Sequence, residues 1–91
     1  MRLAVKFTTQ FKKDLKLANK QNKPIDELFD VVNKLADNES LYAKYKDHAL
    51  IGSYSGYREC HIEPDWLLIY TVKKDILTLV LYRTGSHSEL F

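Results

Sequence analysis

The fold is decided by residues 56–70, which read GYRECHIEPDWLLIY. Residues 57–63 are typical of a strand, Glu63-Pro64-Asp65 of a tight turn, and residues 66–72 of a second strand. The run Trp66-Leu67-Leu68-Ile69-Tyr70 is apolar on both faces, which indicates a central strand covered on both sides. This stretch therefore predicts an antiparallel hairpin.

Further along the chain, Lys73-Lys74-Asp75 is typical of a turn and residues 76–83 of a third strand, which Gly85 ends before a short tail. Toward the N-terminus, residues 37–50 show no period, so we expect a loop there. Residues 2–7 alternate between apolar and polar side chains and predict another strand.

Two helices are expected between the first strand and the loop. Thr8 or Thr9 can cap the first helix, because a hydroxyl accepts a hydrogen bond from an amide of the first turn. Gln21-Asn22-Lys23 ends that helix, and Pro24 suits the first turn of the next one. Both helices carry an apolar stripe at helical spacing, formed by Phe11, Leu15 and Ala18, and by Ile25, Leu28, Phe29, Val32, Leu35 and Ala36.

This order of elements predicts an α+β fold, with the helices packed on one face of a four-stranded sheet. The 91 residues, 45% of them apolar, are enough for one domain with one core, over residues 1–91. The lone Cys60 permits no internal disulfide and suits a reducing cytoplasm. We expect no signal peptide and no membrane span, because no apolar run is long enough.

Basic residues are concentrated in the first half of the chain. Residues 1–46 hold ten Lys and Arg against six Asp and Glu, whereas residues 47–91 hold four against six. Within the first helix the exposed side carries Lys12, Lys13 and Lys16. A one-sided basic element is expected for a protein that binds a polyanion such as RNA, although a solvated helix face has the same pattern.

The expected hairpins bring polar residues to one end of the sheet. In an antiparallel hairpin the residue numbers of two paired residues add up to a constant. The first hairpin then makes residue 61 a neighbour of residue 68. In the second hairpin the numbers of paired residues should add up to about 148. Arg83 is then expected beside Asp65 and Trp66, and the chain returns at Gly85. The residues expected to converge are His61, Asp65, Trp66, Arg83 and His87.

Imidazoles, a carboxylate and a guanidinium suit RNA cleavage without a metal. A histidine can take the proton of a ribose 2′-hydroxyl or protonate the leaving 5′-oxygen, since its pKa lies near neutral pH. Arginine stabilises charge on the phosphorane, and Trp66 or Tyr57 could stack on a base. A zinc site is the rival chemistry, but Cys60 and His61 are adjacent on a strand and point to opposite faces. No Ser-His-Asp pattern or glycine-rich phosphate loop is present.

Three segments together resemble one family. They are residues 46–50 (KDHAL) with Gly52-Ser53, residues 56–70, and residues 83–91 (RTGSHSELF), and in this order they resemble the YafQ-type toxins of the RelE/ParE superfamily. The N-terminal half is similar in its element order and in residues 11–15 (FKKDL). Ala49 stands where proline would be expected, and Cys60 where a small inert residue would be.

The resemblance implies a microbial RNase-like fold and cleavage of mRNA in the A site of the 70S ribosome, with no cofactor or metal. It also implies a cognate antitoxin of the RelB/DinJ kind, with DNA contacted only through the antitoxin complex. The catalytic residues would be His48, His61, Asp65 and His87, with His87 as acid and Asp65 or His61 as base. RNA would be bound by Arg83, Trp66, Phe91, Lys12, Lys13 and Lys16.

Two other functions remain open at this point. A ParE-like toxin that inhibits DNA gyrase without catalysis needs no histidine cluster. A plain RNA-binding module would use the lysine-rich helix alone, and its binding would weaken with salt. Supercoiling assays and message cleavage separate these functions from the nuclease.

Overall fold

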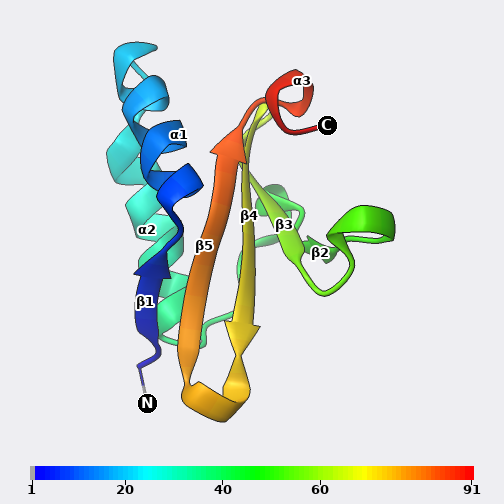
Figure 1. The fold of residues 1–91 in the computed structure, drawn as a ribbon. Coiled ribbons are helices and arrows are strands. Elements are labelled where there is room, and N and C mark those ends of the chain that lie inside the picture. Colours follow the sequence, from blue (N-terminus) through cyan, green and yellow to red (C-terminus); the bar gives the residue numbers. More distant parts are fainter. Residues whose placement is uncertain (1) are drawn as a thin grey trace.

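The computed structural model describes residues 2–91 as three α-helices and one five-stranded sheet (Figure 1). The strand order is β1-β5-β4-β3-β2, with β1 parallel to β5 and the other neighbours antiparallel. The α+β class is confirmed. The elements are β1 Ala4–Phe7, α1 Thr9–Lys20, α2 Ile25–Ala36, β2 His48–Ala49, β3 Arg58–Glu63, β4 Trp66–Lys73, β5 Thr78–Gly85 and α3 His87–Leu90, with 3-10 turns η1 Ala43–Tyr45, η2 Gly52–Tyr54 and η3 Lys74–Ile76.

The expected count of four strands is wrong, because the segment expected as a loop contains the short strand β2. Its residues His48 and Ala49 pair with Glu59 and Arg58. Two residues are too few to show an alternating pattern in the sequence. The expected C-terminal tail also contains helix α3, which begins with a capping box between Ser86 and Glu89.

Both long helices begin and end as their sequences indicate. Thr8 caps α1, and its hydroxyl accepts a hydrogen bond from the amide of Phe11 at 2.9 Å. Pro24 lies at the N-cap of α2, one position earlier than expected. Asn22 and Asn38 follow the two helices with left-handed backbone, a conformation that asparagine tolerates well.

The two helices cover one face of the sheet, which we call the helix face (Figure 1). The core between the helices and the sheet is largely apolar, and burying each large side chain contributes roughly 1.5–3 kcal/mol. Its fully or nearly fully buried members include Phe11, Leu28, Val31, Cys60, Trp66, Leu68, Tyr70, Leu79 and Leu81. The opposite face, which we call the open face, has only a small apolar cluster of Leu67, Ile69 and Leu90.

The strand register differs from the expected one in both hairpins. Glu63 pairs with Trp66 as expected, but an irregularity then places His61 opposite Leu67 instead of Leu68. In the second hairpin η3 and the left-handed Leu77 (φ 48°) lengthen the turn, so Lys73 pairs with Thr78. The expected position of Arg83 beside Asp65 and Trp66 is therefore wrong.

No helix within residues 2–91 combines the length and the apolar character that crossing a bilayer requires.

Candidate active site

A single row of paired residues crosses the open face of the sheet. His48 of β2 pairs with Glu59 of β3, Glu59 with Ile69 of β4, and Ile69 with Arg83 of β5. Directly paired residues of an antiparallel sheet point to the same face. Four strands therefore place an imidazole, a carboxylate and a guanidinium around one apolar floor residue.

The second row lies two residues further along the strands. His61 pairs with Leu67, and Leu67 with Gly85. Gly85 has no side chain at this point, and Glu89 and Leu90 of α3 pack over it, with atoms 3.2–3.3 Å from where a Cβ would stand. The His61 ring centroid lies 6.4 Å from that of His48 and 5.6 Å from that of His87. Three histidines thus line one side of the open face.

The start of α3 and the β3–β4 turn hold His87. The Asp65 carboxylate accepts hydrogen bonds from the His87 amide at 2.9 Å and from its Nδ1 at 2.7 Å. These bonds lower the pKa of Asp65, so this exposed carboxyl is ionised at neutral pH. The pair favours the His87 tautomer with hydrogen on Nδ1 and leaves Nε2 available for a reacting group.

Glu59 is a buried carboxylate between two histidines. It is 5% exposed, and its Oε2 lies 3.1 Å from His48 Nε2 and 3.8 Å from His61 Nε2. His48 Nδ1 lies 2.6 Å from the carbonyl oxygen of Lys46, which can only accept, so Nδ1 carries a hydrogen. Oε2 of Glu59 therefore faces the other ring nitrogen of His48.

Arg83 is held from behind by helix α1. Its Nε donates to Asp14 Oδ2 at 3.0 Å and its Nη2 to Asp14 Oδ1 at 3.1 Å, and this pairing raises the pKa of the guanidinium. The Arg83 side chain is 25% exposed, so part of the fork remains accessible. Asp14 itself is buried.

Aromatic rings form the wall near Arg83. Phe91 is 61% exposed and lies edge-on to Tyr54, with 5.3 Å between ring centroids, while Tyr57 stacks on Tyr82 at 4.6 Å. Trp66 is 0% exposed in the helix-face core, where its Nε1 has no hydrogen-bond partner among the described residues. A fully buried ring cannot stack on a base, so Trp66 supports the site from below, whereas Phe91 and Tyr57 lie in the wall itself.

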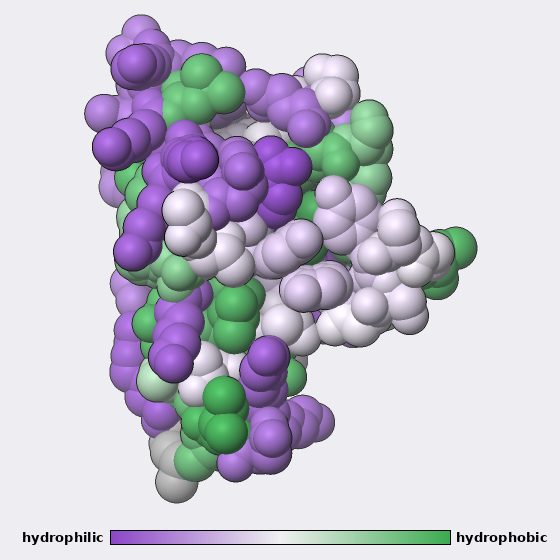
Figure 2. All heavy atoms as spheres, viewed as in Figure 1, coloured by the Kyte–Doolittle hydropathy of each residue, from purple (hydrophilic) through white to green (hydrophobic). Residues whose placement is uncertain are grey.

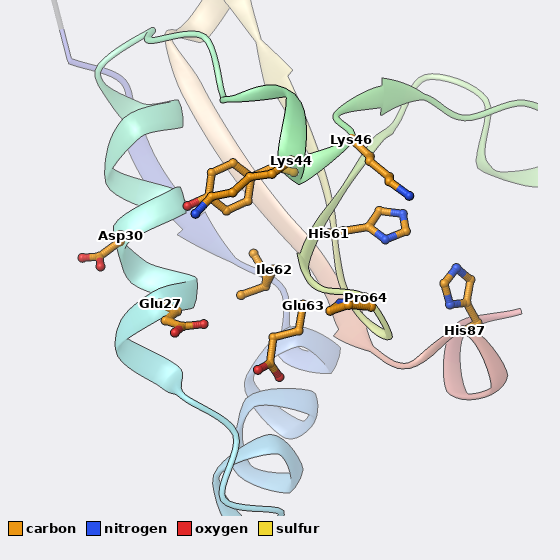
Figure 3. A pocket seen from close by; sticks show the side chains of 10 residues that line it. Glu27, Asp30, Lys44, Lys46, His61, Ile62, Glu63, Pro64 and His87 are labelled. Atoms are coloured by element: carbon orange, nitrogen blue, oxygen red, sulfur yellow. The ribbon is translucent and has the colours of Figure 1, made fainter.

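A cleft of about 770 Å³ opens from the histidines toward helix α2 (Figure 3). In Figure 3 His61 and His87 stand at one end with Lys46 beside them, and Glu27 and Asp30 project from α2 on the other side. The cleft is therefore mixed in charge: Lys46 lies beside the imidazoles, whereas Lys44 reaches toward α2.

The lysines of α1 are not part of this cluster. Lys12, Lys13 and Lys16 are exposed and have no ion pair within residues 2–91. Hydrophilic side chains cover much of this helix in Figure 2. The helix contacts β5, whereas the histidines extend from β2, β3 and α3. The lysines form a separate basic surface.

The thiol of Cys60 is separated from the histidines. It is buried in the helix-face core, and burial raises its pKa, so it stays protonated. The adjacent His61 points to the open face, as the alternation of a strand requires. Within residues 2–91 no group of three or more His, Cys, Asp and Glu side chains is arranged to hold a metal ion.

The sequence reasoning missed two carboxylates that organise this site. Glu59 lies two residues before His61 on the same strand, and this spacing alone places it beside that histidine on one face. Asp14 stands on the apolar stripe of α1, three residues after Phe11 and four before Ala18. A charged residue at such a position indicates a buried ionic partner.

The fold is that of a toxin from a toxin–antitoxin system, as comparison with known proteins shows. The sequence profile described as "Bacterial toxin of type II toxin-antitoxin system, YafQ" matches residues 3–91. The chain belongs to this YafQ family.

Individual relatives are similar over nearly their whole length. The mRNA interferase toxin YafQ of Escherichia coli (strain K12) is 43% identical over 88 residues, covering 96% of this chain and 94% of the relative. The toxin in the E. coli DinJ–YafQ toxin–antitoxin complex matches with a TM-score of 0.90 and 41% identity, over 100% and 99% of the chains. A metal-bound toxin from Helicobacter pylori matches with a TM-score of 0.93 and 47% identity, over 98% and 99%.

Proposed function

We propose that this chain is an endoribonuclease that cleaves mRNA on the ribosome by attack of a ribose 2′-hydroxyl. The observation that carries the proposal is the convergence on the open face, where His48, His61 and His87 lie within 6.4 Å of a neighbouring ring and Arg83 closes the row. A relative 43% identical to this chain is an mRNA interferase.

His61 is the base and His87 the acid in this proposal. Asp65 is the weaker candidate for the base, because its pKa is lowered and its Oδ1 already accepts two hydrogen bonds from His87. Its role is to orient His87. The His61 and His87 rings are 5.6 Å apart and can flank a single phosphate group.

The chemical step breaks one phosphorus–oxygen bond and forms another. His61 takes the proton of the 2′-hydroxyl while its oxygen attacks the adjacent phosphorus. The bond to the 5′-oxygen breaks, and His87 supplies the proton that the leaving oxygen needs. Arg83 stabilises the charge that develops on the phosphorane oxygens. The products are a 2′,3′-cyclic phosphate and a 5′-hydroxyl.

The basic surface of α1 supports a ribosomal partner. Exposed, unpaired lysines at positions 12, 13 and 16 bind phosphate groups without reading sequence. The YafQ toxin of E. coli forms a complex with DinJ, and we propose a RelB/DinJ-type antitoxin for this chain as well. An acidic segment that folds on binding would suit the exposed lysines. DNA would be contacted only through that complex. We propose a cytoplasmic location, because the ribosomes and the antitoxin would be found there.

Cleavage of an end-labelled mRNA programmed into 70S ribosomes tests the proposal. We expect cuts within the A-site codon, with cyclic phosphate and 5′-hydroxyl ends, and none when the scissile nucleotide is 2′-deoxy. Equal cleavage of free mRNA would refute ribosome dependence, and 3′-hydroxyl ends would refute attack by the 2′-oxygen.

The competing functions are outcomes of the same design. Inhibition of DNA gyrase in a supercoiling assay without RNA cleavage would indicate a ParE-like toxin, and salt-sensitive ribosome binding without cleavage would indicate a plain RNA-binding module. The metal-bound H. pylori toxin is the reason for one more experiment, which tests whether cleavage needs a metal. Toxin treated with EDTA and then desalted is expected to keep its activity, and a loss restored by a transition metal would contradict the metal-free step.

A further inference from the structure

The geometry points to Asp14 of helix α1 as a positioning residue that sets the orientation of the Arg83 guanidinium on the open face. The inference rests on the proposed function, because it assigns Arg83 to the reacting phosphate. Asp14 lies 69 residues away from Arg83 in the sequence and on the other side of β5 from the histidines.

The carboxylate of Asp14 is saturated with donors. Arg83 donates two hydrogen bonds to it, the Thr84 amide donates to Oδ2 at 3.2 Å, and the Gln10 amide nitrogen donates to Oδ1 at 3.0 Å. The Asp14 side chain is 8% exposed. Because Arg83 donates to both oxygens and the Thr84 amide also donates to Oδ2, the carboxylate is held in position without the Gln10 bond, and the guanidinium that pairs with it has one orientation.

The ion pair with Asp14 leaves some N–H donors of the Arg83 guanidinium unoccupied by Asp14. Arginine has five N–H donors. The side-on pair with Asp14 occupies one on Nε and one on Nη2. Tyr54 also forms a side-chain hydrogen bond with the guanidinium, so the donors on Nη1 and Nη2 that neither Asp14 nor Tyr54 occupies remain for phosphate oxygens. Fixing these donors before the substrate arrives is what makes electrostatic stabilisation effective, since no reorganisation is then needed during the reaction.

The neutral pair also changes what Arg83 recognises. With Asp14 beside it, Arg83 brings directed donors without adding net charge. It should therefore stabilise the phosphorane more than it increases binding of the ground-state RNA. Loss of Asp14 should lower kcat while KM changes little.

A double-mutant cycle on ribosome-bound mRNA tests this role. Asp14→Asn keeps the shape and an acceptor for Thr84 but removes the charge, and we expect kcat to fall about tenfold with KM within about threefold. In the Arg83→Ala background the same change should alter kcat by less than about twofold. Gln10→Ala is the matched control, since it removes another donor to Asp14 and leaves the arginine pair, and it should keep kcat.

Equal losses from Asp14→Asn in both backgrounds would overturn the inference and indicate a structural role. Full activity of Asp14→Asn or of Arg83→Ala would overturn it too. Hydrogen exchange of Arg83 Nε–H with water, followed by NMR in the isolated toxin, tests the inference independently of RNA cleavage. The Nε–H should exchange slowly with water in the wild type and in Gln10→Ala, and rapidly in Asp14→Asn. Slow exchange in Asp14→Asn would overturn the positioning role, whether or not the toxin cleaves RNA. A wild-type toxin that cleaves no RNA would refute the proposed function but not the positioning of Arg83 by Asp14.

Discussion

The two faces of the sheet use the same strands for opposite purposes. On the helix face Phe11, Leu28 and Trp66 are fully buried against one another. On the open face a floor of Leu67 and Ile69 is ringed by histidines, carboxylates and Arg83. Alternation along each strand separates most of the two sets, because neighbouring residues point to opposite sides. Arg83 is the exception, since a register shift between Ile69 and Tyr70 brings it opposite Ile69 although Leu81 lies on the helix face.

The difference shows how a chain of 91 residues can hold both a core and a site. The helix face supplies most of the apolar burial, so the open face can hold polar groups that stabilise the fold little. Substitutions on the open face should therefore change activity more than stability, and substitutions on the helix face should do the reverse.

The largest effect should come from His87. His87→Ala removes the proposed acid, and we expect mRNA cleavage to fall by about a thousandfold, since general acid catalysis contributes about 10²–10⁴. The melting temperature should stay within a few degrees, because the ring is half exposed. Ser88→Ala is the matched control on the same helix. Retained cleavage in His87→Ala would show that the residue is not catalytic.

The reverse case is Leu28, which is 0% exposed on the helix face. Leu28→Ala should lower the free energy of unfolding by about 3 kcal/mol in urea denaturation, because it leaves a cavity. Cleavage per folded molecule should not change. Leu17→Ala, at a position 46% exposed on α1, should lower stability by less than about 1 kcal/mol. Equal losses of unfolding free energy in Leu28→Ala and Leu17→Ala would contradict the assignment of the stabilising core to the helix face.

The basic surface of α1 should affect ribosome binding and not the rate of cleavage. Replacing Lys12, Lys13 and Lys16 together by Gln should weaken ribosome binding roughly a hundredfold at low salt and flatten its dependence on salt concentration. The cleavage rate at saturating ribosome concentration should be unchanged. An unchanged salt slope would show that this helix does not contact RNA.

Glu59 sharpens the comparison because it is a buried charge on the active side. Glu59→Gln keeps a side chain of the same size facing His48 Nε2 but replaces the carboxyl group by an amide, and we expect cleavage to fall about tenfold. The melting temperature should not fall, since Oε1 of Glu59 has no partner to lose among the described residues. Glu63→Gln on the same strand is the control. A destabilised Glu59→Gln variant with normal cleavage would assign Glu59 to the fold instead.

The smallest effect should be the acid response of Asp65. Its pKa is lowered from 3.8, mainly by the hydrogen bond from the His87 amide, so the folded chain binds this proton more weakly than the unfolded chain. The contribution to stability is complete above the unfolded value and is lost as the pH falls through the folded one. Asp65→Asn should therefore lower stability at neutral pH and converge with the wild type in acid. A difference that persists at the lowest pH would contradict this linkage.

The hairpin over residues 56–70 and both helices could be predicted from the sequence, because turn residues, alternation and helical stripes are local signals. The pairing of Arg83 could not be predicted, since it depends on a left-handed backbone at Leu77 and on a register shift between Ile69 and Tyr70. No motif in the sequence indicates either feature. The two-residue strand β2 was missed for lack of length. Of the predicted site residues, His48, His61, Asp65, Arg83, His87 and Phe91 lie around the open face, whereas Trp66 is buried and the lysines of α1 form a separate surface. Their roles stay predictions.

The parallel pairing of β1 with β5 has a consequence for assembly. β5 lies inside the sheet between β1 and β4, so residues 4–7 find their partners only when residues 78–81 are in place. Such long-range closure slows folding, because the loop entropy is lost before the contacts form. Arg83 sits on that same strand. A chain interrupted before β5 would thus lack an interior strand of its sheet and a functional arginine together, and partly made molecules should be harmless as well as unfolded.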